Sequence, residues 1–351
     1  MNTLRLGLSG FGGIGEIGAR ALARTPGCEL KYVYDTDPQR LRAAAAHAEP
    51  MADLERLVDA PDCDAVIVST RPDTHERLAL AAIRAGKHVL IEKPMANSPE
   101  GCAAIVAAAA QRGVKVACGF NFRYFEAFQA LKRAVQQNQI GPLRYVNGYA
   151  GHTGLTELRS PWMYDRAIMG GGTLMDNGIH LIDMVQWLMG PATEVNAVQS
   201  APVWDVGVEE TAFVQLRGAG PVVATLHSSW TAWKGYKFAV EAFGESGMAV
   251  ASYAPLYFRL VQVERTPRFV RRSVSQFYPG TIVREKLRGW QDTAIRAFVD
   301  EFTEFRRLVA GDPEPLSIAT GLDGQRAVQV AFAAQRSVIE HRRIELPGRA
   351  T

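Results

Sequence analysis

Short apolar runs alternate with helix-length segments through the first 120 residues, and this alternation restricts the chain to very few folds. Five apolar runs are predicted to be buried strands, at residues 4–9, 30–34, 65–69, 88–91 and 114–118. Segments with helical character lie between them, at residues 14–24, 76–85 and 99–112. Strands that alternate with helices of this length predict an α/β fold with a doubly wound parallel sheet.

A glycine-rich segment, Gly10-Phe11-Gly12-Gly13-Ile14-Gly15, joins the first predicted strand to the first predicted helix. With this spacing the first glycine permits a tight turn, the second lets the backbone approach a pyrophosphate, and the third allows close helix–strand packing. The helix N-terminus then offers free N–H groups to the phosphates. Because the segment follows a strand and opens a helix, it predicts a Rossmann domain over residues 1–120 whose cofactor contacts include all six residues.

Asp35 follows the second predicted strand, about 20 residues beyond Gly15, where an acidic group meets the adenosine ribose in such folds. A carboxylate there accepts hydrogen bonds from both ribose hydroxyls and repels a 2′-phosphate, so NAD is favoured over NADP. Arg40 is near enough in sequence to leave NADP open. The structural alternative is that Asp35 only caps the turn 35–38.

The pattern changes from about residue 121, where strand-like stretches with β-branched residues and glycine turns become frequent. These stretches cover residues 144–148, 194–199, 211–216, 222–229, 237–243 and 248–252. Helices are expected at residues 128–136, 175–189, 290–308 and 324–340, and the arginine-rich residues 265–272 are expected to form a solvated loop. The pattern predicts a second domain, over residues 121–351, of α+β type with a large, mostly antiparallel open sheet.

Asp176, His180 and Asp183 lie four and three residues apart within an apolar segment. On a helix such spacing places all three side chains on one face. Burying charged side chains costs folding free energy unless they take part in function or find hydrogen-bonding partners. An imidazole titrates near neutrality and suits proton transfer from a hydroxyl group. Two alternatives stay open: a satisfied core histidine, or a metal site, for which one histidine in the stripe is poor support. We expect no metal.

Three further segments carry a family resemblance: Glu92-Lys93-Pro94 at the end of the fourth predicted strand, Gly119–Tyr124, and Gly170–Asp183 with its three glycines. Together, in this order, they resemble the Gfo/Idh/MocA oxidoreductase family, which includes inositol dehydrogenases and glucose–fructose oxidoreductase. The closing portion, from Gly321 to Pro347, also fits the family, so that the resemblance covers nearly the whole chain.

The resemblance implies roles for individual residues. Lys93 matches the family lysine that reaches the nicotinamide ribose and the substrate hydroxyl, and Asp176 and His180 match the acidic residue and histidine of inositol dehydrogenases. These three are the expected catalytic residues, and they are also expected to bind substrate. Further cofactor contacts are expected at Thr70, Arg71, His75, Glu92 and Asn121, and further substrate contacts at Arg123, Trp162 and Tyr236. For Trp162 and Tyr236 core packing is the alternative, and Arg123 has the alternative of bridging the two domains.

The expected activity is an NAD(P)-dependent transfer of hydride between a secondary hydroxyl of a cyclic polyol, sugar or sugar derivative and nicotinamide. Three alternatives remain: an NAD-dependent glycosidase that oxidises its substrate transiently, an enzyme that keeps its cofactor and shuttles hydride between two sugars, and a dinucleotide-binding sensor without turnover. The resemblance also implies a homodimer or homotetramer, because in the family the open sheet forms such contacts.

Composition and charge pattern limit the classes of binding partner that are expected. The net charge of +3 and the lack of like-charged blocks argue against nucleic acid, and no apolar run approaches membrane-spanning length. The four cysteines lack CxxC spacing, and the N-terminus enters a strand without an apolar signal core. A small-molecule substrate, no membrane or nucleic-acid partner and a cytoplasmic location are therefore expected.

Overall fold

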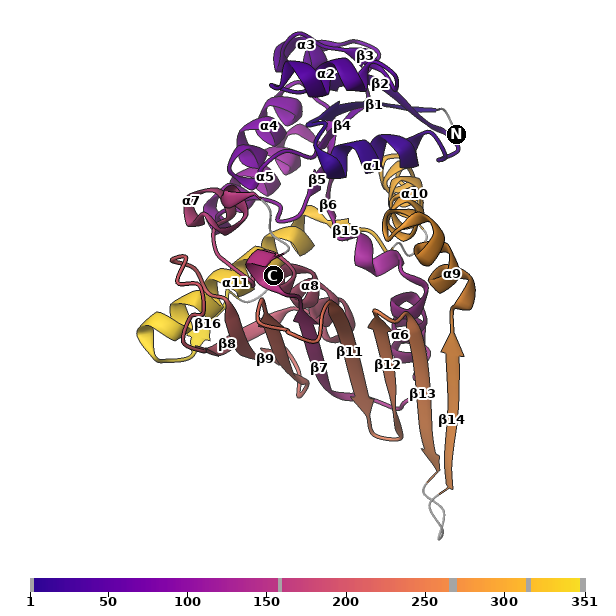
Figure 1. The fold of residues 1–351 in the computed structure, drawn as a ribbon, viewed down its shortest axis with the longest axis vertical. Coiled ribbons are helices and arrows are strands. Elements are labelled where there is room, and N and C mark those ends of the chain that lie inside the picture. The colour runs from indigo at the N-terminus through magenta and orange to yellow at the C-terminus, as the bar shows by residue number, and fades with distance from the viewer. Residues whose placement is uncertain (1–2, 157–159, 265–269, 314–316, 348–351) are drawn as a thin grey trace. The chain divides into compact units, whose positions relative to one another are not determined.

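A computed structural model describes residues 3–156, 160–264, 270–313 and 317–347 (Figure 1). The chain divides into two compact units, of which the first comprises residues 1–124 and 287–328 and the second residues 125–286 and 329–351. The division differs from the predicted domains 1–120 and 121–351, because the chain returns to the first unit after the second has formed.

The first unit contains a seven-stranded sheet in the order β15-β6-β5-β4-β1-β2-β3. Its strands are β1 (Leu4–Ser9), β2 (Cys28–Tyr34), β3 (Glu49–Pro50), β4 (Ala65–Val68), β5 (His88–Glu92), β6 (Val116–Gly119) and β15 (Ala319–Thr320). All neighbours are parallel except β15, which pairs antiparallel with β6. The order of β1 to β6 is that of a dinucleotide-binding fold, which confirms the predicted parallel sheet.

The helices of this unit are α1 (Gly13–Leu22), α2 (Pro38–Ala44), α3 (Leu54–Asp59), α4 (Pro72–Arg84), α5 (Pro99–Arg112) and α10 (Gln291–Val309). Local signals explain α5, because the Ser98 side chain accepts a hydrogen bond from the Gly101 amide and left-handed Gly113 ends the helix. Helix α4 begins at Pro72, a turn before the expected start, because proline suits the first helical position. The short elements β3, α2 and α3 were not predicted.

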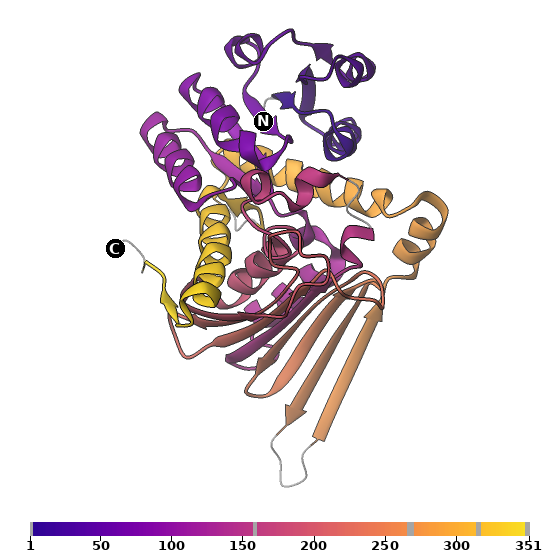
Figure 2. The ribbon, with the colours of Figure 1, turned by 60° about the vertical axis from the view of Figure 1, so that its left-hand side comes forward.

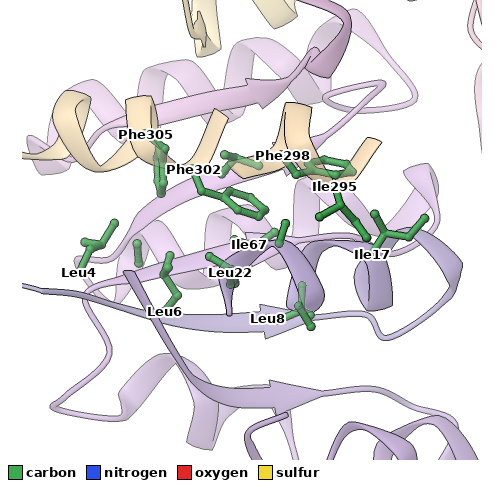
Figure 3. Packing of buried hydrophobic residues seen from close by; sticks show 14 of the residues in the cluster. Leu4, Leu6, Leu8, Ile17, Leu22, Ile67, Ile295, Phe298, Phe302 and Phe305 are labelled. Carbon is green, nitrogen blue, oxygen red and sulfur yellow. The ribbon is translucent and has the colours of Figure 1, made fainter. Parts of the chain in front are cut away.

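The core of the first unit joins its N-terminal residues to the returning helix α10. Figure 3 shows Phe298, Phe302 and Phe305 of α10 beside Leu22 of α1 and Leu6 of β1. These buried side chains belong to one hydrophobic cluster, and this packing assigns α10 to the first unit.

Gly18 of α1 lies buried against this helix, and a Cβ atom there would meet Phe302 Cζ at 3.7 Å, an ordinary contact. Replacing Gly18 by alanine is therefore expected to raise the free energy of unfolding by about 0.5–1 kcal/mol, the usual cost of glycine inside a helix. Urea unfolding followed by circular dichroism measures this change.

Gly15→Ala provides the matched control in the same helix, because its Cβ would lie 2.1 Å from the Gly10 carbonyl oxygen. That variant is expected to be less stable than the wild type. If Gly18→Ala also lost stability, the packing of α1 on α10 would not be as described.

The second unit contains a nine-stranded sheet in the order β14-β13-β12-β11-β7-β10-β9-β8-β16. The strands are β7 (Leu143–Gly151), β8 (Ala192–Gln199), β9 (Thr211–Gly218), β10 (Val223–Ser229), β11 (Lys237–Gly244), β12 (Gly247–Tyr253), β13 (Tyr257–Glu264), β14 (Val270–Phe277) and β16 (Ile344–Glu345). Only β7 and β10 are parallel neighbours, so the predicted, mostly antiparallel sheet is confirmed.

Three of these strands, β13, β14 and the two-residue β16, were not predicted. Strand β14 begins at Val270, where the sequence suggested a solvated loop over residues 265–272, and residues 265–269 lie outside the described ranges. All residues of β14 are exposed, so the strand lacks the alternation of buried and exposed side chains that identifies a half-buried strand in a sequence.

Helices of the second unit lie over one face of its sheet (Figure 2). They include α6 (Glu126–Gln136), which packs on β12 and β13, and α8 (Gly178–Met189), which packs on β7 and β10. Gly148 of β7 permits this approach, because a Cβ atom there would lie 2.6 Å from Leu181 Cδ1. A last long helix, α11 (Gly321–Glu340), begins in the first unit and ends in the second. Within the described ranges, no helix combines the length and apolarity needed to cross a bilayer.

Candidate active site

The glycine-rich loop between β1 and α1 is closely packed on one side and open on the other. Gly10 has a positive φ of 98°, and a Cβ atom there would lie 2.4 Å from the Ser69 carbonyl oxygen after β4. In contrast, a Cβ atom on Gly13 would meet nothing within 4 Å, and one on Gly12 would meet only Arg40 Nη1, at 3.8 Å. Helix α1 begins here without a side-chain cap. The open backbone and the helix N-terminus therefore fit a dinucleotide pyrophosphate.

Asp35, just after β2, ties this loop to the neighbouring turn. Its Oδ2 accepts a hydrogen bond from the Phe11 amide at 2.6 Å, and its Oδ1 accepts one from the Asp37 amide at 2.8 Å. The structural role that was left open for Asp35 is thus observed, whereas the ribose contact stays a prediction. The Phe11 ring is buried in the core of the first unit, while Ile14 beside it is exposed.

The loop between β4 and α4 holds two of the expected cofactor residues, Thr70 and Arg71, and a third, His75, lies in the first turn of α4. Thr70 Oγ1 lies 2.7 Å from Thr74 Oγ1, and exposed Arg71 forms an ion pair with Asp73 at 2.8 Å. His75 is fully buried, with Nδ1 2.9 Å from the Pro94 carbonyl oxygen and Nε2 3.1 Å from that of Thr70. The structure thus places His75 behind this loop, between the backbone segments at Thr70 and Pro94. Burial lowers the pKa of His75.

Glu92 and Lys93 stand at the carboxyl end of β5, the edge at which open α/β sheets bind ligands. Glu92 Oε2 accepts a hydrogen bond from the Lys93 amide at 3.2 Å. Burial raises the pKa of Glu92 to about 7, although the positive charge of Lys93 opposes this shift. On neighbouring β6, a Cβ atom on Gly119 would lie 3.1 Å from Glu92 Cδ, so glycine makes room for this carboxyl group.

Asn121 and Arg123 lie in a 3₁₀ helix, η1 (Asn121–Tyr124), directly after β6. Arg123 is buried, and its Nη1 donates a hydrogen bond to the Ser317 carbonyl oxygen at 3.0 Å. The same nitrogen lies 3.9 Å from Asp323 Oδ2. These contacts hold the returning segment of the chain against the first unit, and the substrate contact of Arg123 stays a prediction.

In the second unit, Asp176 lies in the turn before α8 and not on the helix itself. The helix begins at Gly178, so the prediction of a helix from residue 175, with Asp176 and His180 on one helical face, was wrong. The Thr173 carbonyl oxygen accepts a hydrogen bond from the Gly178 amide at 2.9 Å, and the turn that this bond closes delays the helix. His180 and Asp183 do lie on α8, where both are buried.

Two residues that sequence reasoning missed hold the Asp176 carboxylate. Asp176 Oδ2 accepts hydrogen bonds from His152 Nε2 at 2.8 Å and from Trp230 Nε1 at 3.1 Å. His152 follows β7 and Trp230 follows β10, and these parallel neighbours pair at Gly151 and Ser229. No local signal in the sequence connects these residues, because their proximity depends on the pairing of two strands far apart in the chain.

Glu209 was also missed, and it holds the backbone between the last of the three glycines, Gly172, and Leu174, just before Asp176. Its Oε1 accepts hydrogen bonds from the amides of Gly172 at 2.9 Å and Leu174 at 3.2 Å. A Cβ atom on Gly172 would lie 2.1 Å from the Glu209 carbonyl oxygen, so the glycine permits a close backbone approach. Burial raises the pKa of Glu209.

The two predicted aromatic contacts lie in different surroundings. Trp162 belongs to a 3₁₀ helix, η3 (Pro161–Tyr164), and is half-buried, and Tyr164 in the same helix packs against the cluster around Trp230. Tyr236 is half-buried and meets the Tyr253 ring edge-on, with ring centroids 5.8 Å apart. For both residues the contact with substrate stays a prediction.

Comparisons with known proteins agree with the fold of the two units. Residues 4–120 match the family model described as "Oxidoreductase family, NAD-binding Rossmann fold", and residues 128–250 match the "GFO/IDH/MocA C-terminal domain". The chain is 33% identical to inositol 2-dehydrogenase of Acidothermus cellulolyticus over 275 residues, which cover 76% of this chain and 78% of the relative. It is 28% identical to inositol 2-dehydrogenase of Rhizobium meliloti over 353 residues, covering 98% and 99% of the two chains.

A solved structure shows the same fold at lower identity. Levoglucosan dehydrogenase in complex with NADH and L-sorbose superposes with a TM-score of 0.82 and 24% identity, covering 99% of this chain and all of the other. The first unit is therefore an NAD-binding Rossmann domain, and the second is the C-terminal domain that accompanies it in these oxidoreductases. The chain belongs to the Gfo/Idh/MocA family of oxidoreductases.

Proposed function

We propose that the protein is an NAD-dependent dehydrogenase that oxidises a secondary hydroxyl group of a cyclic polyol, sugar or sugar derivative. The observation that carries the proposal is the buried acid–imidazole segment of the second unit, in which Asp176 and His180 lie among apolar side chains. Burying polar side chains costs folding free energy, and a protein that only binds a dinucleotide, without turnover, would gain nothing from it. The names of the relatives above, two inositol 2-dehydrogenases, support this class of substrate.

Each proposed catalytic residue has a distinct task. The nicotinamide of bound NAD supplies the hydride acceptor. His180 takes the proton of the reacting hydroxyl, because a neutral imidazole is a suitable base near neutral pH. The ammonium group of Lys93 stabilises the negative charge that develops on the hydroxyl oxygen. Asp176 orients the substrate or the His180 ring, and Asp183 holds α8 and His180 in place.

We further propose that residues 10–15 and Asp35 bind the pyrophosphate and adenosine ribose of NAD, with Thr70, Arg71 and Asn121 nearer the nicotinamide. Support comes from the open backbone at Gly12 and Gly13. Arg40 Nη1 would lie 3.8 Å from a Cβ atom added to Gly12, and a guanidinium group at this place keeps NADP open as a second cofactor.

A homodimer or homotetramer is proposed as the assembled state, in the cytoplasm. The support is the sheet surface of the second unit, which exposes several large apolar side chains, among them Tyr145, Val198, Phe213 and Val223. Phe213 stacks on His227 with ring centroids 4.3 Å apart, and Tyr145 stacks on Phe243 at 4.4 Å. Contiguous apolar patches of this kind mark interaction surfaces.

The test is NADH formation by the purified protein with NAD and a panel of inositols, aldoses and their derivatives. Wild-type protein is expected to form NADH with at least one member, and Lys93→Ala is expected to lose this signal, because the ammonium group that stabilises the developing alkoxide is removed. Binding of NADH, followed by its fluorescence, shows whether the variant still holds the cofactor. Silence of the wild type across the panel, with NAD bound, would contradict the proposal in favour of a glycosidase or a hydride shuttle.

A further inference from the structure

A buried hydrogen-bond network surrounds the Asp176 carboxylate. Two donors, His152 Nε2 and Trp230 Nε1, approach one and the same oxygen atom of this carboxylate, Oδ2, at 2.8 and 3.1 Å. His152 is 4% exposed, and Trp230 is fully buried. In such surroundings a carboxylate that loses a donor is left with a large desolvation cost, so each donor matters to where the carboxylate lies.

The hydrogen bonds of His152 determine its tautomer. The Gly154 amide donates a hydrogen bond to Nδ1 of His152 at 3.0 Å, so Nδ1 is an acceptor and carries no proton. The ring proton is therefore on Nε2, from which it is donated to Asp176. Gly154 itself has a positive φ of 54°, and a Cβ atom on it would lie 2.6 Å from Trp204 Cη2. The turn that selects the tautomer thus requires glycine.

The backbones of both donors are held in place by an extension of the sheet. The His152 amide donates a hydrogen bond to the Ser229 carbonyl oxygen at 3.1 Å, and the His152 carbonyl oxygen accepts one from Ala232 at 3.1 Å. The Trp230 amide donates to the Glu210 carbonyl oxygen at 2.8 Å. Because these bonds continue the pairing of β10 with its two neighbours, β7 and β9, the two side-chain donors have defined positions before any substrate binds.

We infer that His152 is a positioning residue which, as the neutral Nε2–H tautomer and together with Trp230, fixes the orientation of the Asp176 carboxylate for catalysis. The inference rests on the proposed function in one respect only, the participation of Asp176 in turnover. Neither donor is a reacting group in this scheme; both act through Asp176.

Two substitutions of His152 distinguish the effect of its hydrogen bond to Asp176 from the effect of the size of its side chain. In His152→Gln the amide nitrogen reaches the place of Nε2 and still donates to Asp176, whereas in His152→Asn the shorter amide reaches only the place of Nδ1. His152→Asn is expected to lower kcat/KM about 10- to 100-fold, the effect of removing one hydrogen bond to a buried charged group. His152→Gln is expected to recover most of this loss. Trp230→Phe removes only the N–H group and is expected to lower kcat/KM about tenfold.

NADH binding serves as the internal control, since the proposed cofactor residues belong to the first unit. It is expected to be unchanged in all three variants, and circular dichroism verifies that they fold. Equal losses in His152→Asn and His152→Gln would show that only the shape of the imidazole matters and would overturn the inference. Full activity of His152→Asn would also overturn it.

A spectroscopic measurement tests the inference independently of turnover. Nuclear magnetic resonance of protein with isotope-labelled histidine reports which ring nitrogen carries the proton, and the His152 signals are assigned by their loss in His152→Gln. The Nε2–H tautomer is expected. Observation of the Nδ1–H tautomer, or of the doubly protonated ring at neutral pH, would refute the positioning role even in a protein that oxidises no polyol. If the protein oxidised no polyol but His152 showed the Nε2–H tautomer, the proposed function would be refuted and the positioning of the Asp176 carboxylate by His152 would stand.

Discussion

Replacing His180 by alanine is expected to lower kcat about 10²- to 10⁴-fold, the range found when a positioned general base is removed. His180 is the buried imidazole of α8, and no bulk water can readily take its place as the base. NADH binding is expected to remain, because the glycine-rich loop belongs to the other unit. Steady-state kinetics with the best substrate of the panel measure the loss, and NADH fluorescence measures binding.

His341→Ala is the matched control, since it removes an exposed imidazole of the same unit. Its kcat is expected to stay close to that of the wild type. A kcat of His180→Ala within about tenfold of the wild type would remove His180 from the proposed role of base and leave it as a core histidine.

The second large effect is expected from Phe302→Ala, which should lower the free energy of unfolding of the first unit by about 3–5 kcal/mol. Phe302 is almost fully buried, stacks on Phe298 with ring centroids 5.7 Å apart, and packs beside Gly18 of α1. Its removal leaves a cavity at the contact between α1 and α10, which rigid neighbours fill only in part. Urea unfolding followed by circular dichroism measures the change.

Arg296→Ala tests the specificity of this effect on the same helix. Its side chain is more than half exposed and forms an ion pair with Asp292 at 3.1 Å. Because Arg296 is largely exposed and the buried Asp292 carboxylate keeps a second partner, Arg288, at 3.6 Å, its loss is expected to cost below about 1 kcal/mol. If the free energy of unfolding fell by a similar amount in both variants, the buried face of α10 would contribute no more to the stability of the first unit than its exposed face.

Local patterns in the sequence were sufficient for most of the first unit. The bounds of α5 were predicted to the residue, because a serine cap, a proline at the first position and a closing glycine are short-range signals. The glycine-rich loop and the strand that ends at Glu92 were found for the same reason. Short elements such as β3 escaped, since two residues carry no periodicity.

Interactions that join distant segments escaped the sequence reading. Phe302 packs on α1 across most of the chain, so the assignment of residues 287–328 to the first unit required the fold itself. Asp176 was expected on a helix because its spacing to His180 is helical, but a turn closed by Thr173 delays the helix to Gly178. Spacing alone does not distinguish a helix from the turn before it.

Periodicity and motifs within a few residues of one another were enough to predict the parallel sheet with its dinucleotide loop, the mostly antiparallel second sheet, and Asp176 and His180 as candidates for chemistry. Lys93 joined these candidates through the family resemblance. The contact of His152 and Trp230 with the Asp176 carboxylate, in contrast, became apparent only from the fold. It follows from the pairing of β7 with β10, and the pairing of strands far apart in the chain depends on the packing of the whole sheet.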